Sequence, residues 1–250
     1  MIITITNQKG GVGKSTLTQN IGAGLAKSGF KTLLIDLDAQ GNLTLASTKE
    51  TPNKTIYEAL KEQKVTSDYI ININKKLDLI PANINLSVAD LEFQEVGKEY
   101  RLREAIQAIK KNYDFILIDT PPTLGLLTLN ALTACDYVII PACADLYSIQ
   151  AISQLAKTIN SIKNYTNKKL KVLGVIITRI NNTTLTKELM ASIEKLTKGV
   201  TKVFNTKIRE AVAIKEAQVK RQDIFTYAPK HKVADDFNNL VKEIIKGVKK

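Results

Sequence analysis

The sequence has few of the residues that build disulfide frameworks, metal clusters and histidine-based active sites. Its 250 residues include two cysteines, one histidine and no tryptophan. Cys135 and Cys143 lie eight positions apart, without the CxxC spacing of metal or redox sites. A single histidine, His231, cannot build a metal site or a catalytic triad alone. These absences argue against a zinc-cluster, redox or disulfide-stapled protein.

Long apolar segments are also missing. No apolar run reaches the roughly 18 residues that span a bilayer. Residues 1–6 lack the basic region and long apolar stretch of a secretory leader. We therefore expect a cytoplasmic protein without stable membrane insertion. With 44% hydrophobic and 24% charged residues, and no linker or repeat, the chain is expected to form a single domain over residues 1–250.

Acidic residues are scarce in the last third of the chain, although the whole chain carries a net charge of +12. Residues 1–162 hold 16 Lys and Arg against 16 Asp and Glu, whereas residues 163–250 hold 20 against 8. A genome-wide bias toward lysine would affect the whole chain, so the local surplus indicates a polyanionic partner such as DNA or an anionic membrane. A solvated lysine-rich surface is the alternative.

Strand and helix patterns alternate along the chain. Apolar or β-branched runs predict strands at 2–6, 31–36, 77–81, 113–119, 137–140 and 172–178, with a short edge strand at 203–205. Apolar residues at helical spacing predict helices at 15–28, 55–62, 90–111, 124–135, 148–164 and 185–196, and a last helix through 237–245. This alternation predicts an α/β fold, a doubly wound, mostly parallel sheet with helices on both faces.

A glycine-rich turn joins the first strand to the first helix, as in a phosphate-binding P-loop. Glycines allow backbone N–H groups to converge on phosphate oxygens, and the helix N-terminus favours the anion. Lys14 is expected to reach the β- and γ-phosphates of ATP, and the Ser15 hydroxyl to bind Mg²⁺. The expected nucleotide-binding residues of the loop are Lys9, Gly10, Gly11, Val12, Gly13, Lys14, Ser15 and Thr16.

Lys9 is a second lysine, five positions before Lys14. The stretch from Asn7 to Thr16 resembles the deviant Walker A motif of the ParA/Soj branch of P-loop ATPases, the family that also holds MinD and the nitrogenase iron protein. The resemblance covers nearly the whole chain and implies a slow ATP hydrolase. It also implies that Lys9 reaches across a nucleotide-sandwich homodimer to the partner's ATP, where a cation would stabilise the transferring phosphoryl group.

Three aspartates follow predicted strands and are therefore expected to face the P-loop. Asp36 and Asp38 lie in a segment similar to the family's D-x-D-P-Q-G-N motif, with Ala39 in place of proline. By this resemblance Asp38 orients the attacking water and Asp36 supports the Mg²⁺ shell. Asp119 resembles the Walker B aspartate that binds Mg²⁺ through water. A structural ion pair for Asp36 and a helix cap for Asp119 are the alternatives.

Residues beyond the P-loop and the aspartates also match the family. The resemblance places Asn181 at a position that contacts adenine in relatives, and Arg209 in the loop that contacts the base, where relatives commonly have proline. Ala213 occupies the place of an arginine thought to contact DNA. Other basic residues are then expected to bind DNA, namely Lys207, Lys215, Lys220, Arg221, Lys230 and Lys232.

The leading interpretation is therefore a DNA-segregation ATPase. ATP would close a homodimer that binds DNA without sequence preference, and hydrolysis stimulated by a ParB-like centromere-binding partner would release it. The protein would be associated with the nucleoid when ATP is bound. The alternative is a MinD-like ATPase switch on a membrane surface, which needs a C-terminal amphipathic anchor. A metabolic P-loop enzyme is a third possibility.

Overall fold

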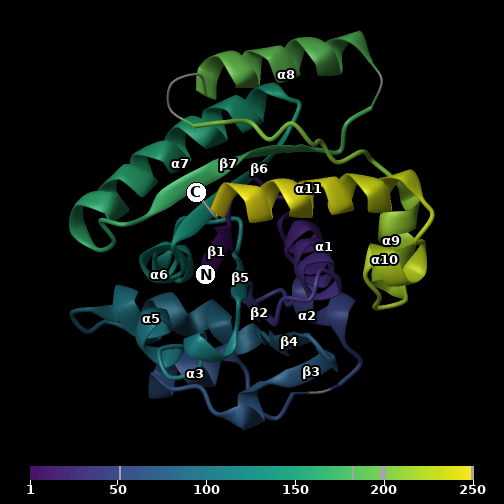
Figure 1. The fold of residues 1–250 in the computed structure, drawn as a ribbon. Coiled ribbons are helices and arrows are strands. Elements are labelled where there is room, and N and C mark those ends of the chain that lie inside the picture. The colour runs from purple at the N-terminus through teal and green to yellow at the C-terminus, as the bar shows by residue number, and fades with distance from the viewer. Residues whose placement is uncertain (51, 182, 198–200, 249–250) are drawn as a thin grey trace.

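The computed structural model describes residues 1–50, 52–181, 183–197 and 201–248, and they form one central sheet covered by helices (Figure 1). Seven strands follow the order β3-β4-β2-β5-β1-β6-β7. All neighbouring strands run parallel except the edge pair β3 and β4. The strands are β1 Ile2–Ile5, β2 Thr32–Asp36, β3 Ile71–Asn74, β4 Leu77–Ile80, β5 Phe115–Asp119, β6 Tyr137–Cys143 and β7 Lys171–Thr178. The expected doubly wound α/β fold is confirmed.

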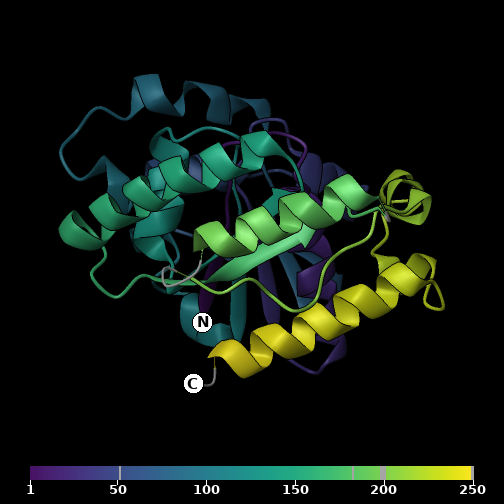
Figure 2. The same cartoon turned by 90° about the horizontal axis from the view of Figure 1, so that it is seen from above.

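Helices cover both faces of this sheet (Figures 1 and 2). The helices are α1 Lys14–Lys27, α2 Asn42–Ser47, α3 Ile56–Glu62, α4 Ala89–Glu92, α5 Arg101–Ala105, α6 Leu126–Ala134, α7 Leu146–Tyr165, α8 Thr184–Thr197, α9 Val212–Val219, α10 Ile224–Tyr227 and α11 Lys232–Val248. Short 3₁₀ segments are η1 Ser67–Tyr69, η2 Ile84–Val88, η3 Lys98–Tyr100 and η4 Lys110–Asn112.

Alternate residues of the buried strands divide between two hydrophobic clusters. On β5, Ile116 and Ile118 belong to the cluster beneath α3, α5, α6 and α7, whereas Leu117 belongs to the cluster beneath α1 and α11. All three side chains are fully buried. Because successive side chains of a strand point to opposite faces, a strand that is apolar throughout must be covered on both sides. The continuous apolar runs in the sequence thus account for the layered architecture.

The prediction of one helix over 90–111 is wrong. The chain there breaks into α4, η3, α5 and η4, and Leu91, which the pattern placed on a buried face, is exposed. Gly97 adopts a left-handed backbone (φ 87°) between α4 and η3. On α6, the Asn130 side chain accepts a hydrogen bond from Leu102 N and donates one to Lys98 O, both at 3.0 Å. These contacts hold the backbone in a path that a continuous helix could not follow.

Two predictions about strands also differ from the structure. β6 continues past Pro141 to Cys143, because the neighbouring strand β1 pairs with β6 only as far as Ile139. A proline without an N–H is tolerated where no ladder bond is needed on that side. Val203 forms only an isolated bridge with Val175, so the predicted edge strand at 203–205 is absent. The polar strand β3 and the helices α9 and α10 were not predicted.

Candidate functional site

The loop between β1 and α1 lies at the carboxyl ends of the parallel strands. Gly11 (φ 74°) and Gly13 (φ 87°) adopt left-handed backbone conformations that favour glycine, and Gly13 precedes the first residue of α1. The Asn7 side chain donates to Pro141 O at 2.6 Å, and the Thr178 hydroxyl donates to Val12 O at 2.9 Å. The ends of β6 and β7 therefore hold the loop in a phosphate-binding shape.

Lys14 opens helix α1 with its side chain turned back over the loop. Only 7% of the residue is exposed, and its Nζ donates to Lys9 O at 3.3 Å. Burial lowers the pKa of the ammonium, while the charges of Asp119 and Asp38 oppose that shift. The cation is thus held next to two carboxylates at the base of the cavity.

Asp119 ends strand β5 as a fully buried carboxylate. Within the described residues neither oxygen has a hydrogen-bond partner. Burial raises the pKa well above its usual value, the charge of Asp36 adds to the rise, and the Ser15 hydroxyl and Lys14 oppose it. A buried carboxylate without partners is costly unless a cation or donor completes it. Asp119 and Ser15 therefore form a site that fits a bound cation, and the alternative of a helix cap has no support.

Asp36 is equally buried but fully hydrogen bonded. One carboxylate oxygen accepts from Thr44 N at 2.9 Å and from Thr44 Oγ1 at 2.7 Å, and the other accepts from Asp38 N at 3.1 Å. Burial raises its pKa to about 6, partly offset by these bonds. Asp36 thus fixes the loop that presents Asp38, and no ion pair involves it among the described residues. A role in the Mg²⁺ shell stays a prediction.

Asp38 lines the larger of two adjoining cavities at this edge of the sheet. One of its oxygens accepts from Gln40 N at 3.0 Å, and the residue is 7% exposed. The same cavity is lined by residues 10, 11 and 13–16 of the glycine-rich loop and by Lys215, Gln218 and Val219 of α9. The predicted phosphate-binding residues and Asp38 therefore meet at one place, and Val12 lies beneath them as a buried residue.

Lys9 contacts its own chain in this structure. Its ammonium forms an ion pair with Asp145 and lies 5.8 Å from the centroid of the Tyr147 ring. Asp145 also caps α7, where its other oxygen accepts from Ser148 N at 2.8 Å. The pair is partly exposed, with 28% of the Lys9 side chain accessible. Lys9 therefore lies at the surface beside the glycine-rich loop, paired with a residue of its own chain.

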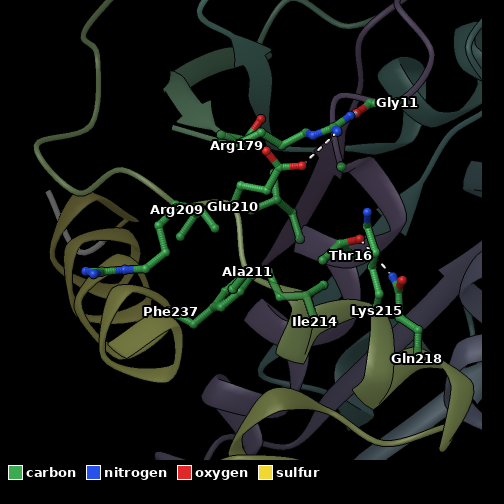
Figure 3. Close-up of a pocket in the computed structure, with 14 residues that line it drawn as sticks. Gly11, Thr16, Arg179, Arg209, Glu210, Ala211, Ile214, Lys215, Gln218 and Phe237 are labelled. Atoms are coloured by element: carbon green, nitrogen blue, oxygen red, sulfur yellow. Dashed lines mark hydrogen bonds and ion pairs between the residues drawn. The ribbon is translucent and has the colours of Figure 1, made fainter. Parts of the chain in front are cut away.

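A second, more apolar cavity adjoins the first (Figure 3). Its apolar wall comprises Leu17, Ile208, Ile214 and Phe237. Arg179 lies at its rim, where its guanidinium donates to Gly11 O at 3.2 Å and to Glu210 at 3.0 Å. The two cavities share Gly11, Gly13, Thr16, Lys215 and Gln218. An apolar pocket joined to a phosphate-binding loop has the layout of a nucleotide site, with the base in the pocket.

Neither of the two residues expected to contact the nucleobase presents its polar side-chain atoms to the apolar cavity, although Arg209 is among the residues that line it. The Arg209 guanidinium binds Asp236 of α11 through two hydrogen bonds of 2.6 and 2.7 Å and points away from the cavity (Figure 3). Asn181 accepts hydrogen bonds from the hydroxyls of Thr183 and Thr186 at the start of α8 and does not line the cavity. Their contacts with a nucleotide stay predictions. Of the two, only Arg209 lies at the apolar cavity.

Arg179 and Gln218 were missed by the sequence analysis. Arg179 directly follows β7 and has a left-handed backbone (φ 54°), so the rule that ligands gather at strand carboxyl ends could have found it. Gln218 donates to the Thr16 hydroxyl at 2.9 Å across 202 positions of sequence. No local pattern signals that contact.

Four of the six predicted DNA-binding residues lie together, and Lys207 and Lys215 lie apart from them. Lys220, Arg221, Lys230 and Lys232 are exposed near the end of the molecule formed by α9, α10 and the start of α11 (Figure 1). None of the four joins an ion pair within the described residues. Lys207 pairs with Glu194 at 3.7 Å, and Lys215 lines both cavities. The structure therefore separates Lys215 from the outward basic group.

No helix in the described residues is long and apolar enough to cross a membrane. The apolar side chains of α11, including Phe237, Leu240, Val241 and Ile244, are buried against the sheet and α1.

Comparison with known proteins identifies similar sequences and structures. A family model described as an AAA domain matches residues 1–172. The chain is 39% identical to the sporulation initiation inhibitor protein Soj of Bacillus subtilis, over 97% of each chain. It is 35% identical to the chromosome partitioning protein ParA of Myxococcus xanthus, over 98% of this chain and 88% of that protein.

Solved structures show the same fold. A putative plasmid partition protein of Borrelia burgdorferi, bound to AMPPNP, is 26% identical with a TM-score of 0.81, covering 98% of each chain. Cobyrinic acid a,c-diamide synthase of Mycobacterium smegmatis, with bound ADP and magnesium, is 28% identical with a TM-score of 0.86, covering 99% of this chain and 95% of that chain.

Proposed function

The chain belongs to the ParA/Soj family of P-loop ATPases, and on this premise we propose that it is a DNA-segregation ATPase that binds DNA as an ATP-loaded homodimer. The observation that carries the ATPase part is that Lys14, Ser15 and Asp38 line one cavity, with the buried carboxylate of Asp119 beside Lys14 and Ser15. Relatives named Soj and ParA support the partition role.

The cavity suits ATP with Mg²⁺. In the described part of the chain, no three His, Cys, Asp or Glu side chains gather into a metal site. Mg²⁺ is commonly held by one carboxylate, waters and substrate phosphates rather than by an all-protein cage. Ser15 and the unpartnered carboxylate of Asp119 would hold the ion, which would supply positive charge to the phosphate oxygens. Lys14 would neutralise the β- and γ-phosphates from the other side.

Hydrolysis needs a polar group next to the terminal phosphate. Asp38 lines the cavity with Lys14 and Ser15, and Asp36 holds its backbone in place through the bond from Asp38 N. A carboxylate in this position accepts a hydrogen bond from the attacking water and orients it. The few catalytic groups within a single chain agree with slow turnover before a partner completes the site.

Dimer formation would complete the site with Lys9 of the second molecule. This ammonium is paired with Asp145 of its own chain, in a contact that is partly exposed and so weakly stabilising. Exchange of that contact for the phosphates of a facing ATP therefore costs little. Lys9 would stabilise charge on the transferring phosphoryl group in trans, as an arginine finger does.

DNA binding would use the outward basic group. Lys220, Arg221, Lys230 and Lys232 have no acidic partner within the described residues, so they are available to phosphates. Backbone contacts of this kind are independent of sequence and weaken steeply with salt. The group adjoins α9, which lines the nucleotide cavity, so occupancy of the cavity can affect the DNA surface.

A ParB-like partner would stimulate hydrolysis and so release the protein from DNA. The protein would therefore associate with the nucleoid while it is an ATP-bound dimer, and it would leave the nucleoid after hydrolysis. The MinD-like alternative needs a C-terminal helix with a free apolar face. In α11 that face is already buried against the sheet and α1, which favours the DNA-binding role.

Binding to non-specific duplex DNA tests the proposal. Wild-type protein and Lys14→Ala are compared with ATP, with ADP and without nucleotide, at several salt concentrations. We expect binding only for wild type with ATP, falling steeply with salt. The double variant Lys230→Gln, Lys232→Gln should weaken DNA binding. The control Lys110→Gln, Lys111→Gln should not, because these two exposed lysines precede β5, at the end of the strand away from Asp119. Absence of DNA binding in every state would reject the DNA role and leave the ATPase assignment standing.

A further inference from the structure

Lys215 lies between the two cavities of the nucleotide site, on the face of α9 turned toward the glycine-rich loop. It lines the apolar cavity together with Ile214 and the larger cavity together with Lys14 and Ser15. Figure 3 shows its side chain running beside Thr16, on the cavity side of the helix. This placement separates it from Lys220, the residue that directly follows α9, which lines neither cavity.

We propose that Lys215 is a nucleotide-binding residue whose ammonium contacts the α-phosphate. This inference rests on the proposed use of ATP and is independent of DNA binding. A base in the apolar cavity and terminal phosphates near Lys14, Ser15 and Asp38 place the α-phosphate where the cavities join. The residues common to both cavities, including Thr16 and Lys215, mark that junction.

The charge of Lys215 is available for this role. No ion pair of the described residues includes it, and the residue is exposed. The neighbouring carboxylate at the rim, Glu210, is already paired with Arg179 at 3.0 Å. A phosphate at the junction would be the first anionic partner of Lys215, and charge-assisted bonds to phosphate are among the stronger hydrogen bonds.

Helix α9 is held firmly enough to present this side chain. Gln218, one turn further along, donates to the Thr16 hydroxyl at 2.9 Å. Just beyond α9, Ile224 N donates to the buried Asn20 side chain of α1 at 2.8 Å. Since both partners belong to α1, the helix that starts at the phosphate-binding loop, the distance between Lys215 and that loop is fixed by the fold rather than by the nucleotide.

Calorimetric binding of ADP and of adenosine to Lys215→Gln tests the assignment, with Lys111→Gln, at an exposed lysine outside both cavities, as the matched control. We expect Lys215→Gln to weaken ADP about tenfold, the loss typical of one charge-assisted hydrogen bond, while adenosine binding is unchanged. Lys111→Gln should leave both unchanged, and Lys215→Arg should restore most of the ADP affinity. Circular dichroism checks that each variant is folded.

Steady-state kinetics and DNA binding supply further readouts. A contact with the α-phosphate is made equally in ground and transition states, so Lys215→Gln should raise KM about tenfold and leave kcat nearly unchanged. DNA binding at saturating ATP should equal that of wild type. Unchanged ADP affinity would overturn the inference, and so would an equal loss for adenosine, which would indicate a loosened base cavity. Neither result depends on whether the protein binds DNA.

Discussion

At the scale of single residues, the two buried aspartates at the ends of β2 and β5 show how differently a carboxylate can be used. Asp36 and Asp119 are paired in register on adjacent strands, and both are fully buried. Asp36 accepts three hydrogen bonds, whereas both oxygens of Asp119 lack partners in the described residues. The first carboxylate stabilises a loop, and the second leaves both of its oxygens available to a cation.

Substitution of these aspartates should therefore have opposite effects on stability. In the metal-free protein, Asp119→Asn should raise the free energy of unfolding by about 1–3 kcal/mol, because it removes a fully buried carboxylate that accepts no hydrogen bond from the described residues. Asp36→Asn should lower it by about 1–3 kcal/mol, because an amide cannot accept all three bonds. Urea denaturation measures both. Destabilisation by Asp119→Asn would contradict the cation-site interpretation, and loss of Mg²⁺-dependent hydrolysis in that variant would support it.

The two cysteines should differ in reactivity. Burial raises the pKa of Cys135 to about 12, so its thiolate is scarce at neutral pH. Cys143 is only half-buried. We expect a thiol reagent at pH 7.5 to modify Cys143 in the folded protein and to modify Cys135 only after unfolding in urea. Peptide mapping identifies the labelled residue, and rapid labelling of Cys135 in native protein would show that the core beside β6 opens readily.

At the scale of elements, α1 depends on glycines for its close approach to the sheet. A Cβ on Gly22 would lie 2.4 Å from Leu34 Cδ2 and 3.5 Å from Leu117 Cδ1, both fully buried side chains. A Cβ on Gly24 would lie 2.7 Å from Val241 of α11. Helix α1, which carries Lys14, can therefore pack closely against both the sheet and α11 because glycines occupy these two contact positions.

Gly22→Ala should lower the free energy of unfolding by about 1–3 kcal/mol, the usual range for overpacking, even though alanine favours a helix. Gly247→Ala near the end of α11 is the control. The nearest atoms to its Cβ would be Leu173 Cδ1 at 3.1 Å and the flexible Lys202 Nζ at 3.3 Å. We expect that change to be neutral or slightly stabilising in urea denaturation. A neutral Gly22→Ala would show that Leu34 can move away at little cost.

At the scale of the whole molecule, the nucleotide site joins parts of the chain that are distant in sequence. Its walls come from α1 and the glycine-rich loop, from the end of β7 and from residues 208–218. The bond from Gln218 to Thr16 spans 202 positions, and the bond from Thr178 to Val12 spans 166. A ligand in this site therefore contacts both ends of the chain at once.

Nucleotide should accordingly stabilise the molecule as one unit. At a free ADP concentration of 100 times the dissociation constant, the free energy of unfolding should rise by about 2.7 kcal/mol. Tyrosine fluorescence and far-UV circular dichroism should report the same urea midpoint with and without ADP. Lys14→Ala should abolish the shift. Separate midpoints for the two signals would show that part of the chain, such as α9 to α11, unfolds independently of the sheet.

Much of the fold followed from local patterns in the sequence. Strand β5 was predicted because four consecutive apolar residues precede Asp119, and the helix predicted at 55–62 proves to carry a capping box at Thr55 and Glu58. The helix predicted at 90–111 failed because the Asn130 side chain and Gly97 determine that backbone, and neither contributes to an apolar period. Local periodicity cannot report a hydrogen bond from another helix.

The sequence by itself determined the phosphate-binding loop, the buried parallel strands and the aspartates that follow them, because each depends on neighbouring residues within one turn or strand. Only the tertiary structure decided which basic residues face the nucleotide and which face solvent. Lys215 and Lys220 look alike in sequence, yet α9 directs the first into the site and the second away from it. That difference arises from contacts with α1, about 200 positions earlier, which bring the two ends of the chain together around one ligand.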